Sequence, residues 1–253
     1  SLFRKRVGIP VNDKFEFEDL DLILEKTAKT IPFENLCIIK NNTKEINKEN
    51  LINKMLVKNE GGLCYELNSL LYFFLIENGF NVRLSRGVVY NNVNQKYLTF
   101  GRTHVTVLLT HEDETYLIDT GFGANLPLTP VPLNGRTVSS NNGEFRIKKE
   151  NTNYGDYVLE LKLKHKDTDW RVGYTFDSKE TISDVSEFNE IQTIIAEHDE
   201  STFNKHALVT RLTDDGNITL TNTSFTQWKN GSVTKEDINE ETYKELAKQH
   251  FGI

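Results

Sequence analysis

The spacing of apolar residues in this 253-residue chain changes period near residue 80, and that change limits its possible folds. Before it, apolar residues recur every three to four positions, the spacing of amphipathic helices. This pattern predicts helices over residues 16–30 and 47–57, and a third that begins near Cys64 and stops at Asn78-Gly79. The first third of the chain is therefore expected to be helical.

Beyond residue 80 the apolar residues alternate with polar ones, which is the pattern of half-buried strands. Turn-rich stretches separate the runs, as at residues 91–94 and 134–143. Several short strands in succession predict a barrel or a sandwich. The clearest alternating runs are residues 80–84, 105–109, 145–147 and 159–163.

The last part of the chain mixes both patterns. We expect a helix over residues 186–198, then a hairpin whose strands, 206–213 and 217–225, join across Asp214-Asp215-Gly216. A closing helix is expected over residues 234–249, because Thr234 and Asp237 resemble a capping box. The chain has no GxGxxG or GxxxxGK motif and no parallel βαβ series, which argues against a nucleotide-binding α/β sheet.

Charge and composition exclude several classes of partner. The net charge of −7 argues against non-specific nucleic-acid binding, which needs a basic surface. The longest apolar run, residues 70–76, is far shorter than the roughly 20 residues that span a bilayer, and residues 1–14 lack the apolar core of a secretory signal. Two cysteines, Cys37 and Cys64, make neither a disulfide framework nor a cysteine-rich zinc site, so we expect a cytoplasmic protein without a metal.

Cys64 is a candidate nucleophile because of its position at the start of the third expected helix. Gly61 and Gly62 precede it and allow the backbone to turn sharply. Unpaired N–H groups and the positive end of the helix dipole stabilise a thiolate at such a position. The alternative is a buried and inert cysteine, which is the commoner role of a free thiol.

A thiolate needs a base, and His104 is the histidine embedded in an expected strand, residues 102–110. A turn centred between Glu112 and Asp113 would place His104 opposite Gly121 and Asp119 opposite Thr106. His104 and Asp119 then share one face as diagonal neighbours, roughly 7–8 Å apart. A slip of one residue would put them on opposite faces. The alternative for Asp119 is a residue that caps the following turn.

Cys64, His104 and Asp119 together resemble a catalytic triad. The carboxylate fixes the tautomer of the imidazole, which takes the proton of the thiol, and the thiolate attacks a carbonyl carbon. Such a site suits acyl transfer or hydrolysis through a thioester. The sequence shows no histidine, cysteine or carboxylate cluster with the spacing of metal ligands.

Four ordered motifs resemble those of the arylamine N-acetyltransferase family. Residues 61–68 read GGLCYELN, like the family's active-site signature, and residues 31–36 read IPFENL, like the motif that precedes it. Residues 103–104 resemble the catalytic-histidine strand, and residues 117–123, LIDTGFG, resemble the aspartate motif. The resemblance spans nearly the whole chain.

The resemblance implies an α+β fold of three parts: a helical bundle over residues 1–79, an antiparallel β-barrel over 80–184, and an α/β lid with a closing helix over 185–253. It implies ping-pong acetyl transfer from acetyl-CoA, through Cys64, to an aromatic amine, hydrazine or N-hydroxyarylamine. Phe122 and Gly123 would then line the acceptor pocket. The resemblance leaves the oligomeric state, the preferred amine and the residues that bind the CoA nucleotide open.

One departure from the family pattern concerns the loop that carries Cys64. The family usually has arginine before the two glycines, where this chain has Glu60. That arginine is expected to support the loop through the motif glutamate, here Glu34. Either another cation such as Lys58 replaces it, or the loop is held differently. Cys37, close to the same motif, is interpreted as a buried structural thiol.

Two alternatives to the acetyltransferase stay open at this point. A cysteine hydrolase or transglutaminase-like enzyme has the same order of cysteine, histidine and aspartate, since such triads recur on unrelated folds. A catalytically silent protein that binds CoA or an aromatic ligand would keep the pocket without the reaction. The extended motifs disfavour the first alternative, and the intact triad disfavours the second.

Overall fold

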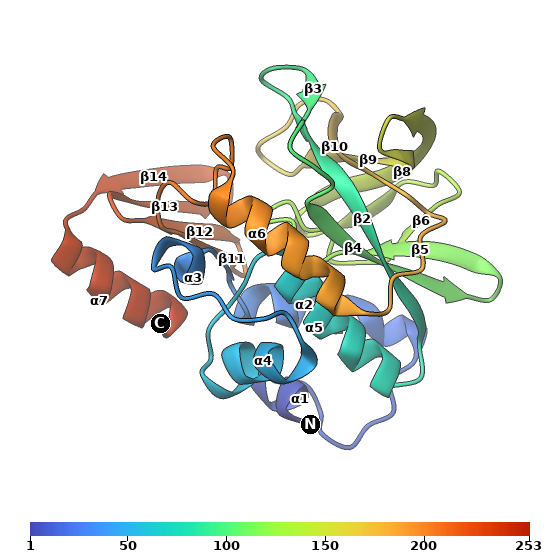
Figure 1. Cartoon of the computed structure of the whole chain (residues 1–253), viewed down its shortest axis with the longest axis horizontal. Helices are drawn as coiled ribbons and strands as arrows, with labels where there is room; N and C mark the ends of the chain where they lie inside the picture. Colours follow the sequence, from blue (N-terminus) through green and yellow to red (C-terminus); the bar gives the residue numbers. More distant parts are fainter.

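The computed structural model describes residues 1–253, and its N-terminal part is helical, as the sequence predicts (Figure 1). The longest helix, α5, begins at Cys64 and ends at the Asn78 cap. None of the helices is both long and apolar enough to cross a membrane. The helical segments of this part are α1 (Leu2–Val7), η1 (Phe17–Asp19), α2 (Leu20–Thr30), α3 (Leu36–Ile39), α4 (Lys48–Ile52), the π-turn η2 (Asn53–Val57) and α5 (Cys64–Glu77).

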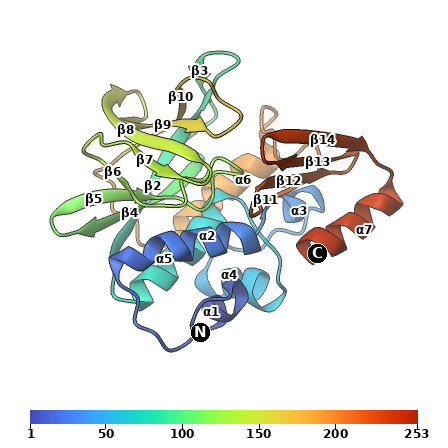
Figure 2. The same cartoon turned by 180° about the vertical axis from the view of Figure 1, so that it is seen from behind.

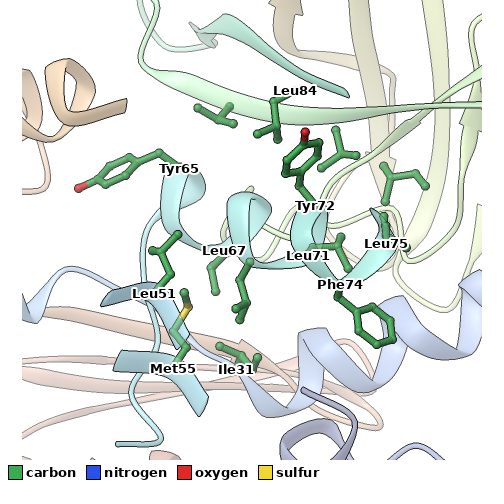
Figure 3. Packing of buried hydrophobic residues seen from close by; sticks show 14 of the residues in the cluster. Ile31, Leu51, Met55, Tyr65, Leu67, Leu71, Tyr72, Phe74, Leu75 and Leu84 are labelled. Atoms are coloured by element: carbon green, nitrogen blue, oxygen red, sulfur yellow. The ribbon is translucent and has the colours of Figure 1, made fainter. Parts of the chain in front are cut away.

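Helix α5 lies at the centre of the molecule, between the other N-terminal helices and the first large sheet (Figures 2 and 3). Its side chains are buried on nearly every face, because both neighbours pack against it. The buried apolar side chains of α5 belong to a core of 31 buried residues. Figure 3 shows part of this core around Leu67, Leu71 and Leu75. This packing fixes the position of α5 between the other helices and the sheet.

The second part is a curved antiparallel sheet that nearly closes into a barrel, with the strand order β6-β5-β4-β2-β10-β9-β8-β7 and β3 beside β2. A second core of ten buried residues fills it. The prediction of a barrel is confirmed. The strands are β2 (Asn81–Asn91), β3 (Lys96–Tyr97), β4 (His104–His111), β5 (Glu114–Ile118), β6 (Val131–Pro132), β7 (Val138–Ser140), β8 (Gly143–Thr152), β9 (Gly155–Leu163) and β10 (Arg171–Phe176).

The register between β4 and β5 is the one that the sequence predicts. His111 pairs with Glu114, and Val107 pairs with Ile118. The turn is therefore centred between Glu112 and Asp113, both of which have positive φ angles. This register carries Asp119, the residue after β5, to the face of the sheet on which His104 lies.

The third part is a five-stranded sheet of order β1-β11-β12-β13-β14. Its first strand, β1 (Phe33–Glu34), comes from the N-terminal part and pairs with β11. Helix α6 packs against the core around α5, so this third part is continuous with the helical part. The other elements are η3 (Val185–Phe188), α6 (Asn189–Glu197), β11 (Leu208–Leu212), β12 (Gly216–Thr221), β13 (Ser224–Lys229), β14 (Ser232–Asp237) and α7 (Glu240–Phe251).

Two expectations for the C-terminal part are wrong. The expected strand 217–225 is broken after Thr221, so its end belongs to β13. The closing helix begins at Glu240 and not near Thr234, because residues 232–237 pair with β13 across an Asn230-Gly231 turn with positive φ angles at both residues. The cap of α7 is Asn239, whose side chain accepts from the Thr242 N–H at 2.8 Å.

Truncation of one core residue of α5 tests the packing around this helix. Leu75 is fully buried, and the next residue, Ile76, is 45% exposed. We expect Leu75→Ala to lower the free energy of unfolding by about 2–5 kcal/mol, because it removes buried methyl groups and leaves a cavity. Ile76→Ala, the matched control, should change it by less than about 1 kcal/mol. Equal effects in urea denaturation would contradict the buried position of Leu75.

Candidate active site

The loop before Cys64 is held against the IPFENL segment by backbone hydrogen bonds. The Gly62 N–H donates to the Pro32 carbonyl oxygen at 3.2 Å, and the Glu34 N–H donates to the Gly62 carbonyl oxygen at 3.0 Å. A Cβ atom on Gly61 would lie 2.0 Å from the Pro32 carbonyl oxygen, so only glycine allows this approach. The two glycines thus fix the direction from which the chain enters α5.

The loop after β5 approaches the start of α5 equally closely. A Cβ atom on Gly121 would lie 2.8 Å from both the Cα atom of Cys64 and the side-chain nitrogen of Asn68. The Gly121 N–H donates to Asp119 Oδ1 at 2.7 Å, which orders the turn. Glycine at position 121 therefore lets the aspartate loop lie directly against the cysteine.

His104 and Asp119 form a buried hydrogen-bonded pair. His104 Nε2 lies 2.8 Å from Asp119 Oδ2, and the residues are only 3% and 2% exposed. This position is the one that the strand register predicts. Because Nε2 faces the carboxylate, Nδ1 is the ring nitrogen left for Cys64. The geometry therefore brings together the three residues singled out from the sequence.

Two further residues support the carboxylate, and sequence reasoning gave neither a role. Asn68 donates to Asp119 Oδ1 at 2.9 Å, and the Tyr174 hydroxyl donates to Asp119 Oδ2 at 2.7 Å. With His104 and the Gly121 N–H, four donors surround this buried carboxylate, which satisfies its acceptor capacity. Asn68 stands in the GGLCYELN motif, which is a usable signal. Tyr174 lies on β10, far along the chain, and nothing in the sequence around it signals this role.

Burial and pairing act in opposite directions on the two charges. Burial alone would lower the pKa of His104, but the Asp119 carboxylate and, less strongly, Cys64 raise it to about 10. Burial alone would raise the pKa of Asp119, but the His104 imidazolium and the hydrogen bonds hold it below its ordinary value. The pair is therefore charged at neutral pH.

The Cys64 sulfur lies at the floor of a pocket beside this pair. Its Sγ is 3.3 Å from the carbonyl oxygen of Thr103. As the first residue of α5, Cys64 lies where the backbone N–H groups of a helix have no intrahelical partner. The sulfur is therefore accessible, and a group attached to it would be within reach of hydrogen-bond donors.

The pocket has a volume of about 360 Å³ and a largely apolar wall. Phe122 and Gly123 line it, as the resemblance implies. The Phe122 ring packs edge-on against His104, with centroids 5.3 Å apart. Phe33 and Phe203 form a second edge-on pair at 5.5 Å. Aromatic walls of this kind suit a flat aromatic ligand.

The outer wall of the pocket is fixed by Asn35, the asparagine of the IPFENL motif. Its side-chain nitrogen donates to the carbonyl oxygens of Phe203 and His206, and its oxygen accepts from the Leu208 N–H. These bonds hold the segment after α6 across the pocket. The IPFENL motif thus contacts both the loop before Cys64 and the segment after α6.

The cation that supports the cysteine loop is not Lys58. Lys58 lines the cavity below the loop but makes no ion pair there. Lys54 contacts Glu34 instead, with 3.5 Å between Nζ and Oε1, because the turn η2 directs it inward. Cys37 lies beside it, and burial raises the pKa of its thiol to about 11, as suits a structural cysteine.

Comparisons with known proteins find relatives over nearly the whole chain. A model of the N-acetyltransferase family matches residues 16–253. A probable arylamine N-acetyltransferase of Dictyostelium discoideum is 31% identical, over 98% of this chain and 90% of that protein. The arylamine N-acetyltransferase structure from Bacillus cereus, described as having a unique Cys-His-Glu catalytic triad, is 46% identical with a TM-score of 0.94, covering 100% of this chain and 97% of that one.

A Mycobacterium marinum arylamine N-acetyltransferase solved in complex with CoA shares the fold, with a TM-score of 0.85 at 22% identity over 99% of this chain and 91% of that one. The fold and the site define a cysteine-dependent acyltransferase. The chain belongs to the arylamine N-acetyltransferase family. The expectation of an acetyltransferase is thus confirmed over the hydrolase and the silent binding protein.

The reactivity of Cys64 toward iodoacetamide should depend on Asp119. The His104 imidazolium, which persists toward about pH 10, favours the reactive thiolate form of a neighbouring cysteine, so the native protein should be alkylated readily near pH 7. In Asp119→Asn the counter-ion is lost, burial lowers the pKa of His104, and alkylation near pH 7 should fall about tenfold or more. Peptide mass spectrometry measures the rate at Cys64, and superimposable profiles would contradict the charged pair.

Proposed function

We propose that this protein transfers acetyl from acetyl-CoA to aromatic amines with Cys64 as nucleophile, His104 as proton carrier and Asp119 as the group that orients it. The observation that carries this proposal is the chain of contacts from the buried Asp119 through His104 to a sulfur at the floor of an aromatic pocket. Each group is held by a different element, so the fold itself assembles the site.

In the first half-reaction the Cys64 thiolate attacks the carbonyl carbon of acetyl-CoA. Backbone N–H groups in the first turn of α5 stabilise the oxyanion, because they point toward the N-terminus of the helix, which begins at Cys64. When the tetrahedral intermediate collapses, the bond to the CoA sulfur breaks, and that sulfur takes the proton of the His104 imidazolium. The products are acetyl-Cys64, neutral His104 and free CoA.

In the second half-reaction an aromatic amine replaces CoA in the pocket. Its nitrogen attacks the thioester carbonyl, and His104 accepts a proton from that nitrogen. Collapse of the intermediate releases the Cys64 thiolate beside the imidazolium, which restores the starting pair. Asp119 keeps its negative charge throughout and holds Nε2, so that Nδ1 always faces the reacting sulfur.

We assign Phe122 and Gly123 to the acceptor pocket. Phe122 packs against His104 and Tyr174, so its ring is fixed and offers a flat apolar face next to the sulfur. Gly123 has a φ angle of 58° and open space beside it, which leaves room for a substituent on the acceptor ring. We also infer a cytoplasmic location, where a reducing environment keeps the Cys64 thiol free.

Intact-protein mass spectrometry tests the covalent step. We expect acetyl-CoA alone to add the mass of one acetyl group, which disappears when an aromatic amine is supplied. Cys64→Ala should lose the adduct, whereas Cys37→Ala, the other cysteine, should keep it. An adduct that persists in Cys64→Ala would contradict the assignment, and an adduct that water removes as fast as the amine does would favour a hydrolase.

A further inference from the structure

A buried cluster of charges lies directly beneath the loop that carries Cys64. The Lys54 side chain is 16% exposed, and those of Glu34 and Glu66 are 2% and 4% exposed. Together they line a cavity of about 150 Å³ that shares no lining residue with the aromatic pocket. Buried charges are costly unless they are paired, so this arrangement requires an explanation.

Lys54 is the one cation in contact with both carboxylates. Its Nζ lies 2.6 Å from Glu66 Oε2 and 3.5 Å from Glu34 Oε1. The third neighbour of the amine is the sulfur of Cys37, at 3.4 Å. Burial alone would lower the pKa of Lys54, but Glu66 and Glu34 raise it well above its ordinary value. The amine therefore stays charged and is held from three sides.

Each of the two glutamates also contacts the backbone next to Cys64. The second oxygen of Glu66, Oε1, accepts from the N–H of Leu63, the residue before the cysteine, at 3.1 Å. Glu34 donates its own N–H to the carbonyl oxygen of Gly62 and is fixed by its Oε2, which accepts from the Leu36 N–H at 2.7 Å. Lys54 thus joins the two segments that hold the cysteine loop in place.

The backbone around Lys54 is irregular in a way that serves this contact. Residues 53–57 form a π-turn, in which the Lys58 N–H donates to the Asn53 carbonyl oxygen at 2.9 Å. Such wide turns are rare and occur often at functional sites. Here the turn follows α4 and places Lys54 inward, while Lys58, one turn later, forms no ion pair. The structure thus supplies a matched control residue.

We propose that Lys54 is a positioning residue for the nucleophile: it holds Glu34 and Glu66 so that the loop presents Cys64 to His104 and to the pocket. This inference rests on the proposed role of Cys64. It predicts that loss of the amine displaces the sulfur without removing any group that touches substrate. A displacement of about 1 Å is enough to slow such a reaction on the order of 100-fold.

The test compares Lys54→Met with Lys54→Arg and with Lys58→Met. We expect Lys54→Met to slow alkylation of Cys64 by iodoacetamide, and formation of the acetyl-enzyme, by about 10–100-fold. Lys54→Arg should recover most of both rates, and Lys58→Met should leave both unchanged. Alkylation needs neither acetyl-CoA nor an amine, so it reports on Lys54 even if the proposed acetyl transfer fails.

A variant that is less stable but keeps its site intact distinguishes a positioning role of Lys54 from a general loss of stability. Leu75→Ala removes packing at the far end of α5 and should leave the alkylation rate of Cys64 unchanged well below its melting temperature. If Lys54→Met does not fold, Lys54→Gln takes its place, because an amide can still donate hydrogen bonds but carries no charge. Native rates at Cys64 in the folded neutral variant would overturn the proposal.

Replacing the Lys54 cation by one at position 60 gives a second and independent test. Glu60 lines the same cavity, and its charge is among those that raise the pKa of Glu34. An arginine at position 60 would therefore place a cation at the cavity that Glu34 and Glu66 line. We expect Lys54→Met with Glu60→Arg to recover at least part of the rate lost in Lys54→Met alone. A double variant no faster than Lys54→Met would contradict a role for the charge itself.

Discussion

The buried pair of His104 and Asp119 is the interaction on which the site depends. Two charges buried to this extent are stable only when each is fully paired, and Asp119 has four donors around its two oxygens. Those donors come from α5, from β4, from the loop after β5 and from β10. The pair therefore joins the barrel to the helix that carries Cys64, so the contacts that complete the fold also set the protonation state of the site.

Much of this arrangement can be predicted from the sequence, because it follows from local rules. Two glycines before Cys64 indicate a sharp entry into a helix, and the stop at Asn78-Gly79 is equally local. The register of β4 and β5 follows from a short turn, and it places His104 and Asp119 on one face. The family motifs then add the fold and the acyl acceptor, which spacing alone leaves open.

The features that the sequence does not reveal are those that depend on contacts between distant segments. Tyr174 reaches Asp119 from β10, and nothing near it in sequence signals that role. The ion pairs of Lys54 depend on an irregular turn that the sequence does not signal, and the sequence suggests Lys58 instead. The start of the closing helix was misplaced because pairing with β13 outweighs a weak capping signal.

The central claim is that Asp119 keeps the His104 imidazole protonated at neutral pH. Nitrogen NMR of protein labelled in its histidine rings measures this directly, with His104 assigned by substitution. The account predicts two protonated ring nitrogens at neutral pH and a titration toward about 10, since the Asp119 carboxylate raises the pKa of His104. A neutral ring at neutral pH, titrating at or below its ordinary value, would contradict it.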